Sequence, residues 1–224
     1  MIFHLAAKPS VQWSVDNPSE ALSHNVLGTS RVLEFAKEVN CRRVIFASSA
    51  AVYGDKGIPN SPYGMHKLMS ENECKLYSQL YDIDTVALRY YNVYSEDQPY
   101  GGSYSTVISA WMEMIRQNRS LRIDGDGSQT RDFIHVDDIV DANIFCMKHP
   151  KKFDGQACDV GTGIQTSLNE LKEKIDKLLD LRWEYTPART GDIANSVADI
   201  GPLEKLGWRA TKDITEGLIN CFTP

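Results

Sequence analysis

The sequence lacks the features that mark secreted, zinc-binding or membrane-spanning proteins. Its five cysteines are odd in number and never spaced as C-x-x-C, which argues against a disulfide framework and favours a reducing, cytoplasmic location. The five histidines show no metal-ligand spacing, so we expect no metal site. No apolar stretch approaches the ~18 residues that a membrane span requires, and the N-terminus lacks the charged lead and long apolar run of a secretion signal.

Positive charge is also scarce. The chain has 24 Lys and Arg against 30 Asp and Glu, which gives a formal net charge of −6. This balance gives no electrostatic basis for binding nucleic acid or an anionic membrane, so we expect neither as a partner. The 224 residues, 42% of them hydrophobic and 24% charged, are enough for one large globular domain or two small ones.

Predicted strands alternate with predicted helices along the chain. Short apolar runs at 2–7, 43–49 and 85–90 are typical of buried strands, and the periodic segments 16–40 and 63–82 are typical of helices. The second half predicts shorter elements: helices at 105–118, 136–147 and 167–180, strands at 131–136, 157–160 and 183–186, a turn at 122–129 and two short helical pieces near the C-terminus. This alternation predicts an α/β fold with a parallel sheet, in which ligands bind beyond the carboxyl ends of the strands.

The strongest chemical signal is the pair Tyr63 and Lys67, which opens the second predicted helix. A spacing of four places both side chains on one helix face. A lysine ammonium near a phenol favours the phenolate, so the pair predicts a tyrosine that acts as a base near neutral pH. By itself this spacing is also typical of an exposed tyrosine beside a solvated lysine. The preceding loop, which follows a strand ending in Ser48 and Ser49, favours the catalytic interpretation.

Several longer motifs surround this pair. They are S-S-A-A-V-Y-G at 48–54, S-P-Y-G-x-x-K at 61–67, L-R-Y-Y-N-V-Y at 88–94, G-D-G-x-Q-T-R-D-F at 125–133 and R-x-G-D-x-x-x-S-x-A-D at 189–199. In this order they resemble the extended short-chain dehydrogenase/reductase family of NAD-dependent nucleotide-sugar epimerases and dehydratases. The resemblance implies a Rossmann-like, doubly wound parallel sheet with a small C-terminal α/β substrate domain.

The resemblance implies a catalytic set of Ser49, Tyr63 and Lys67. Tyr63 corresponds to the general acid/base, and Lys67 to its pKa partner, which also contacts the nicotinamide ribose. Ser49 corresponds to the residue that binds the reacting sugar hydroxyl. The implied cofactor is NAD, and the implied cofactor-binding residues are Ala7, Lys8, Asn25, Ser48, Tyr63, Lys67 and Tyr90.

A UDP-sugar site is implied in the second half of the chain. Asn92 and Arg131 correspond to residues that hold the pyrophosphate, for which the planar arginine fork is well suited. Arg189 and Asp192 correspond to a late pair near phosphate and the nucleotide ribose.

Three further residues complete the implied substrate site. Arg122 and Asp124 lie where the family binds uracil, largely through the backbone. Ser196 lies at a position where small residues accompany N-acetylated sugars, so UDP-GlcNAc and UDP-GalNAc are the first expected substrate pair.

One part of the family pattern has no counterpart in these residues. The family begins with a strand, a glycine-rich loop and a helix that bind the cofactor pyrophosphate, whereas the glycine pairs here lack the G-x-x-G-x-x-G spacing. The run at 2–7 corresponds to the family's fourth strand. The resemblance therefore implies a truncated sheet without its first βαβαβ portion, a weak or partial NAD site and an exposed edge strand. We expect residues 1–95 to be the remaining dinucleotide-binding part and 96–224 mainly the sugar-nucleotide domain, with 132–147 returning to the first part.

The implied activity is NAD-dependent 4-epimerisation of a UDP-hexose through a 4-keto intermediate, an isomerase reaction of carbohydrate metabolism. UDP-glucose and UDP-galactose are the second expected pair. A UDP-sugar decarboxylase or dehydratase, and a nucleotide-sugar-binding remnant without redox chemistry, stay open as alternatives, as does supply of the missing strands by another chain. Family members pair two helices that correspond to 16–40 and 63–82, so a homodimer through a four-helix bundle is expected.

Overall fold

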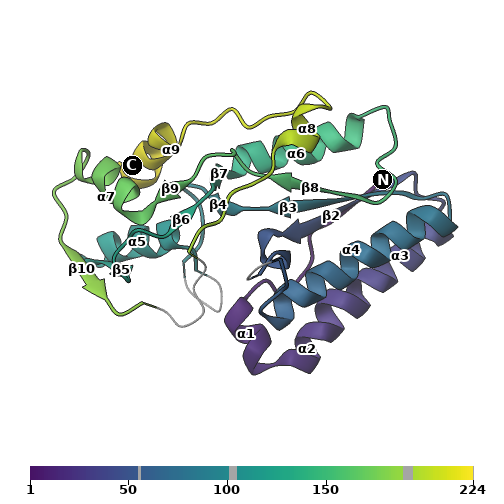
Figure 1. The fold of residues 1–224 in the computed structure, drawn as a ribbon, viewed down its shortest axis with the longest axis horizontal. Helices are drawn as coiled ribbons and strands as arrows, with labels where there is room; N and C mark the ends of the chain where they lie inside the picture. Colours follow the sequence, from purple (N-terminus) through teal and green to yellow (C-terminus); the bar gives the residue numbers. More distant parts are fainter. Residues whose placement is uncertain (55–56, 101–104, 189–193, 224) are drawn as a thin grey trace. The chain divides into compact units, whose positions relative to one another are not determined.

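The computed structural model describes residues 1–54, 57–100, 105–188 and 194–223. The chain forms two compact units (Figure 1). The first unit comprises Met1–Tyr90, Val140–Val160 and Asp199–Arg209, and the second comprises Tyr91–Ile139, Gly161–Ala198 and Ala210–Pro224. Which ligand each unit binds stays a prediction.

The first unit contains a parallel sheet covered by helices on both faces. Its elements are β1 (Ile2–His4), α1 (Val11–Asp16), α2 (Pro18–Leu22), the π-helical turn η1 (Ser23–Leu27), α3 (Gly28–Glu38), β2 (Arg43–Ser49), the 3-10 turn η2 (Ala50–Val52), α4 (Pro62–Leu80), β3 (Asp84–Tyr90), most of α6 (Val136–Lys148), β8 (Gln156–Val160) and α8 (Gly201–Glu204). The strand order is β1-β2-β3-β8, and every neighbouring pair is parallel. Helices α3 and α4 lie on one face and α6 and α8 on the other (Figure 1). This arrangement confirms the predicted parallel α/β fold.

The local sequence explains the central elements of this sheet. In β2 the residues from Arg43 to Ser48 are all buried, because the strand has neighbours on both sides and helices over both faces. Helix α4 begins where Ser61 accepts a hydrogen bond from the amide of Gly64 and Pro62 occupies the first turn. Strand β1 is shorter than the predicted run at 2–7 and lies at the edge of the sheet.

The predicted helix at 16–40 is divided in the structure. An additional helix, α1, precedes it and is capped by the Ser10 hydroxyl, and Asn17 then leaves the helical conformation before Pro18 starts α2. A π-helical turn separates α2 from α3 and contains the buried Asn25. Such turns insert an extra residue into a helix and are frequent at functional sites.

The second unit is built from short strands around a separate apolar core. Its elements are β4 (Asn92–Tyr94), α5 (Val107–Arg116), β5 (Leu121–Asp124), β6 (Thr130–Arg131), β7 (Phe133–His135), β9 (Thr166–Ser167), α7 (Leu168–Asp176), β10 (Trp183–Thr186) and α9 (Ile214–Phe222). Strand β10 pairs with β5 and β4 with β7, both in parallel, whereas β6 and β9 are antiparallel. The predicted turn at 122–129 is wrong in its first part, because Leu121–Asp124 forms a strand with two buried side chains that face the core.

No helix in the part of the chain that the structure describes is long and apolar enough to cross a membrane. Within the same residues, no three His, Cys, Asp or Glu side chains gather as a candidate metal site.

Candidate functional site

The carboxyl end of β2 presents two serines with different surroundings. Ser49 is half-buried, and its hydroxyl accepts a hydrogen bond from the Ala51 amide at 3.2 Å, which starts the η2 turn. Ser48 is buried and donates its hydroxyl to the Glu71 carboxylate on α4. The two hydroxyls differ because neighbouring strand residues point to opposite faces of the sheet.

The η2 turn packs directly against the first turn of α4. A Cβ atom added to Gly64 would lie 2.3 Å from the Ala51 carbonyl oxygen, so only glycine permits this contact. This close approach brings the Ser49 segment next to the helical turn that carries Tyr63 and Lys67.

Tyr63 and Lys67 are both buried on this helix, with 8% and 3% of their surfaces exposed. The Tyr63 amide donates to the Ser14 hydroxyl on α1 at 3.0 Å, which fixes the start of α4. The Lys67 amine donates to the Ala47 carbonyl of β2 at 2.6 Å and lies 5.8 Å from the centroid of the Tyr63 ring. Burial lowers the pKa of Lys67 to about 8, although the nearby Cys74 and Glu71 side chains oppose this effect. The lysine thus changes charge close to neutral pH, beside the phenol.

Hydrogen bonds connect the predicted cofactor residue Asn25 to the segment of Ala7 and Lys8. The Asn25 side chain accepts the Lys8 amide at 2.8 Å and donates to the Lys8 carbonyl at 3.1 Å, which fixes the backbone just beyond β1. The Asn25 carbonyl in turn accepts hydroxyls from Thr29 and from Ser70 of α4. Asn25 therefore joins the carboxyl end of β1 to the helix that carries Tyr63 and Lys67.

Tyr90 ends β3 beside Ser49, its register partner in β2. Its hydroxyl is hydrogen-bonded to the Asn143 side chain of α6. Burial raises the pKa of Tyr90 to about 12, so this phenol stays protonated at neutral pH.

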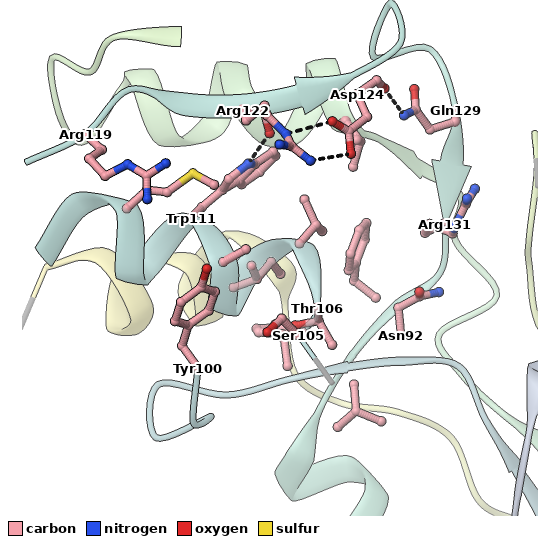
Figure 2. A pocket seen from close by; sticks show the side chains of 18 residues that line it. Asn92, Tyr100, Ser105, Thr106, Trp111, Arg119, Arg122, Asp124, Gln129 and Arg131 are labelled. Atoms are coloured by element: carbon pink, nitrogen blue, oxygen red, sulfur yellow. Dashed lines mark hydrogen bonds and ion pairs between the residues drawn. The ribbon is translucent and has the colours of Figure 1, made fainter. Parts of the chain in front are cut away.

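The second unit contains an open pocket of about 520 Å³ (Figure 2). Its wall includes the four predicted residues Asn92, Arg122, Asp124 and Arg131. The other lining residues are Val93, Tyr94, Tyr100, Ser105, Thr106, Val107, Ile108, Ala110, Trp111, Met114, Arg119, Gln129, Phe133 and Leu168.

Strand β5 forms the polar wall of this pocket (Figure 2). The Arg122 guanidinium pairs with the Asp124 carboxylate at 2.8 Å, and that carboxylate also accepts the Thr186 hydroxyl at 2.6 Å. The carbonyls of the same two strand residues are engaged as well, by the Trp111 indole at 2.8 Å and by the Gln129 amide at 2.7 Å. These bonds hold the strand rigidly while half of the Arg122 side chain stays exposed.

Asn92 and Arg131 are held by the backbone around Asp132. Both the amide and the side chain of Asn92 donate to the Asp132 carbonyl, at 3.0 and 3.2 Å. The Asp132 carboxylate is fully buried and accepts bonds from the backbone of Thr162, Gly163 and Ala198. This network fixes the strand that presents Arg131 to the pocket.

The late substrate residues are placed only in part. Ser196 is half-buried, and its amide donates to the Thr130 carbonyl at 3.2 Å, next to Arg131. Arg189 and Asp192 lie outside the described residues.

Sequence reasoning missed several polar residues in both units. In the pocket these are Thr106, Arg119 and Gln129, which were not assigned to the site. In the first unit they are Tyr53, Glu71, Arg89 and Asp159, which are linked by hydrogen bonds and ion pairs. The spacing of four between Lys67 and Glu71 was a usable signal for one of them.

A model of the NAD dependent epimerase/dehydratase family matches residues 1–161. This chain belongs to that family. A curated epimerase relative, a putative UDP-glucose 4-epimerase from Methanocaldococcus jannaschii, is 37% identical over 97% of this chain and 74% of its own length.

Solved structures of family members have the same fold. A UDP-N-acetylglucosamine 4-epimerase from Methanobrevibacter ruminantium, solved with UDP-N-acetylmuramic acid, matches with a TM-score of 0.91 and 34% identity, over 98% of this chain and 74% of that chain. A UDP-glucuronic acid 4-epimerase from Bacillus cereus, solved with UDP-glucuronic acid and NAD, matches with a TM-score of 0.89 and 27% identity, over 99% and 74%. All three of these relatives are named as 4-epimerases of UDP-sugars.

Proposed function

We propose that this protein is an NAD-dependent 4-epimerase of UDP-hexoses. The observation that carries the proposal is the arrangement of Ser49, Tyr63 and Lys67, in which the buried lysine amine lies beside the phenol and the serine turn packs on the same helix. The family relatives described above, which are UDP-sugar 4-epimerases, support the same reaction.

In this reaction Tyr63 takes the proton of the sugar 4-hydroxyl and returns it to the same oxygen after the 4-keto sugar has turned over. Lys67, when protonated, stabilises the phenolate that accepts this proton, and Ser49 hydrogen-bonds the reacting hydroxyl. The chemistry that bound NAD would supply is hydride transfer: removal of the hydride from C4 of the sugar and its return to the opposite face of the same carbon.

The described residues fit the nicotinamide half of NAD. The Lys67 amine supplies a donor for a ribose hydroxyl, and Asn25 fixes the backbone of Ala7 and Lys8 beyond the carboxyl end of β1, where nucleotides bind in such sheets. Tyr90 supplies a protonated phenol at the end of β3. The Ser48 hydroxyl, which we also expected at this site, is engaged with Glu71.

The second unit is proposed to bind the UDP moiety. Arg131 and Asn92 are assigned to the pyrophosphate, because a guanidinium and an amide suit phosphate oxygens. The β5 backbone beside Arg122 and Asp124 is assigned to uracil, and Arg189 and Asp192 to the late phosphate and ribose contacts. Ser196 favours UDP-GlcNAc and UDP-GalNAc over UDP-glucose and UDP-galactose, because a small side chain leaves space for an N-acetyl group.

The protein is also proposed to form a homodimer through helices of the first unit. Leu22 of α2, Phe35 of α3 and Leu76 and Leu80 of α4 are each more than 40% exposed. Exposed apolar side chains on neighbouring helices are typical of an interaction surface, and a second copy would cover them in a four-helix bundle.

The test is an NMR time course of UDP-GlcNAc and of UDP-glucose with millimolar NAD. We expect the 4-epimer to form, and we expect Tyr63→Phe to reduce turnover by about 10²–10⁴-fold, because the variant has no group to move the proton. Binding of UDP is measured in parallel and should not change.

The matched control is Tyr81→Phe, which removes the hydroxyl of an exposed tyrosine directly after the same helix and should retain full turnover. Tight UDP-sugar binding without turnover by the wild type would contradict the proposal and favour a binding protein without redox chemistry. Formation of a dehydrated sugar would instead indicate a dehydratase. UDP-glucuronic acid is run as a third substrate, and its conversion to a pentose would indicate a decarboxylase.

A further inference from the structure

A buried network of charged side chains lies at the carboxyl end of the sheet in the first unit. Ser48, Arg89 and Asp159 occupy matching register positions on β2, β3 and β8. Register partners in a parallel sheet point to the same face. The Glu71 carboxylate comes from α4, which covers this face, so the network joins the helix to three neighbouring strands.

Arg89 is the centre of this network. Its guanidinium binds both Glu71 carboxylate oxygens, at 2.9 and 2.7 Å, in the bidentate geometry that makes such pairs strong. A third guanidinium nitrogen donates to the Tyr53 hydroxyl at 2.7 Å, and that hydroxyl donates to Asp159 at 2.7 Å. Only 7% of the Glu71 side chain and 19% of the Arg89 side chain are exposed.

The network reaches both segments that carry the proposed catalytic residues. Tyr53 directly follows the η2 turn, which begins after Ser49. Glu71 lies one helical turn after Lys67, on the helix face that Lys67 shares with Tyr63. The pair of Glu71 and Arg89 thus connects the turn and the helix at a second point, beyond the Gly64 contact.

We propose that Glu71 and Arg89 are positioning residues: their ion pair holds the turn after Ser49 against the helix of Tyr63 and Lys67 and supplies a paired charge one helical turn from Lys67. The catalytic meaning of this role rests on the proposed function. The placement of the charges is a property of the unliganded chain and can be tested without it.

Other titratable groups described around Lys67 are neutral at pH 7, so the pair of Glu71 and Arg89 should have the main effect on the pKa of Lys67. His4 of β1 is neutral at pH 7, because burial and the Lys67 charge lower its pKa to about 4. Cys74 of α4 is neutral as well, because burial raises the pKa of its thiol to about 12. Strand β2 offers the Ala47 carbonyl and the Phe46 ring, and Tyr63 offers a phenol. Glu71, paired with Arg89, remains as the charged neighbour on the same helix.

Single substitutions in the pair should therefore move the titration of Lys67 in opposite directions. Glu71→Gln removes the anion and leaves the Arg89 cation, so the pKa of Lys67 should fall below that of the wild type. Arg89→Met leaves the Glu71 and Asp159 anions without their guanidinium partner, so the pKa of Lys67 should rise. The double variant Glu71→Gln/Arg89→Met removes the charges of the pair and should bring the pKa back toward the wild-type value, with the Asp159 anion left in place.

The experiment is a ¹³C NMR titration of labelled lysine side chains in the protein without NAD or sugar. The Lys67 signal is assigned by its loss in Lys67→Arg. We expect shifts of about 0.5 pH unit or more, downward in Glu71→Gln and upward in Arg89→Met. If Arg89→Met does not fold, the double variant and Arg89→Lys carry the test, and Arg89→Lys should keep the wild-type titration because it keeps the charge.

Turnover supplies the second readout. Tyr53→Phe changes no charge, so the titration of Lys67 should not move, whereas kcat should fall by about tenfold with an unchanged KM for the UDP-sugar, because the turn loses one anchor. Tyr81→Phe is again the control and should change neither value.

Each result decides a separate question. An identical Lys67 titration in the wild type and both single variants would overturn the role of Glu71 and Arg89. So would a loss in Tyr53→Phe that lies entirely in KM. A wild type without turnover would contradict the proposed function alone, because the titration is measured without substrate and still decides the placement of the charges.

Discussion

The two units of this protein treat their positively charged side chains differently. In the first unit Arg43 and Lys67 are each less than 5% exposed, and each is held by hydrogen bonds or an ion pair. In the second unit the pocket arginine Arg122 pairs with Asp124 while about half of its side chain stays in solvent. Charges interact more strongly away from water, so the first unit is suited to controlling a proton and the second to binding and releasing an anionic ligand.

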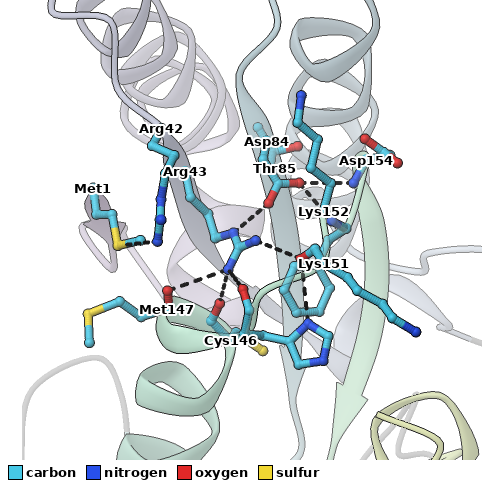
Figure 3. Close-up of polar contacts among 12 residues, drawn as sticks. Met1, Arg42, Arg43, Asp84, Thr85, Cys146, Met147, Lys151, Lys152 and Asp154 are labelled. Carbon is cyan, nitrogen blue, oxygen red and sulfur yellow. Dashed lines mark hydrogen bonds and ion pairs between the residues drawn. The ribbon is translucent and has the colours of Figure 1, made fainter.

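Arg43 is the clearest example of the buried class (Figure 3). It forms an ion pair with Asp84 of the neighbouring strand, and its guanidinium donates to the carbonyls of Cys146, His149 and Lys151. These carbonyls lie at and just after the end of α6, where helix carbonyls have no partner within the helix. Arg43 therefore joins β2, β3 and the end of α6.

The largest expected effect on stability follows from removing this arginine. Arg43→Met leaves the buried Asp84 carboxylate without its counter-charge and three carbonyls without their guanidinium donor, so the free energy of unfolding should fall by about 3–5 kcal/mol. Urea unfolding measures the change. Arg42→Met is the matched control, because Arg42 is exposed and should change stability by less than ~0.5 kcal/mol. Equal losses of unfolding free energy in the two variants would contradict the view that the buried arginine stabilises this unit more than the exposed one.

The sequence predicted the framework around this arginine but not its partners. Continuous apolar runs such as the one in β2 predict a buried strand directly, and the capping signal Ser61 and Pro62 marks the start of α4. The pairing of Arg43 with Asp84 depends on the register between β2 and β3, and residues 41 positions apart carry no local signal. The helix α1 was missed because its exposed apolar residues Val11 and Val15 do not form the usual buried stripe.

Site residues that lie close together in the sequence could be predicted, whereas residues brought together by tertiary packing could not. Tyr63 and Lys67 stand four residues apart on one helix, so their shared face followed from the sequence alone. Arg89 and Tyr53 come from segments whose contact depends on tertiary packing, and their roles emerged only with the structure. The strand β5 was misread because glycines follow it immediately and gave a turn signal over the whole stretch.

A smaller effect is expected when the pH is lowered. Burial and the Lys67 charge lower the pKa of His4 from 6.5 to about 4. Between these two pH values the imidazole is therefore protonated in the unfolded chain and neutral in the folded chain. The free energy of unfolding therefore has its full value above pH 6.5 and should fall by about 1–3 kcal/mol as the pH drops to 4.

Urea unfolding at pH 7, 5.5 and 4.5 measures this dependence. In His4→Gln the loss over the same range should be smaller than in the wild type, because the titrating group is gone. His24→Gln replaces an exposed histidine and should retain the wild-type slope. If the unfolding free energy of His4→Gln depended on pH as in the wild type, protonation of His4 would not cause the loss of stability. The contrast between the two units would then be weaker.

An effect of comparable size is expected at the open pocket of the second unit. Arg131→Gln removes a guanidinium from the wall that is proposed to bind the UDP pyrophosphate, so the Kd for UDP should rise by about 10–100-fold while kcat at saturating substrate stays unchanged. Calorimetry and the NMR time course measure the two quantities. Arg116→Gln, on the exposed surface of α5 and outside the pocket wall, should change neither. A fall in kcat equal to the loss of affinity would mean that Arg131 acts in the chemical step. The view that buried charges serve proton transfer and exposed charges serve ligand binding would then be wrong for this residue.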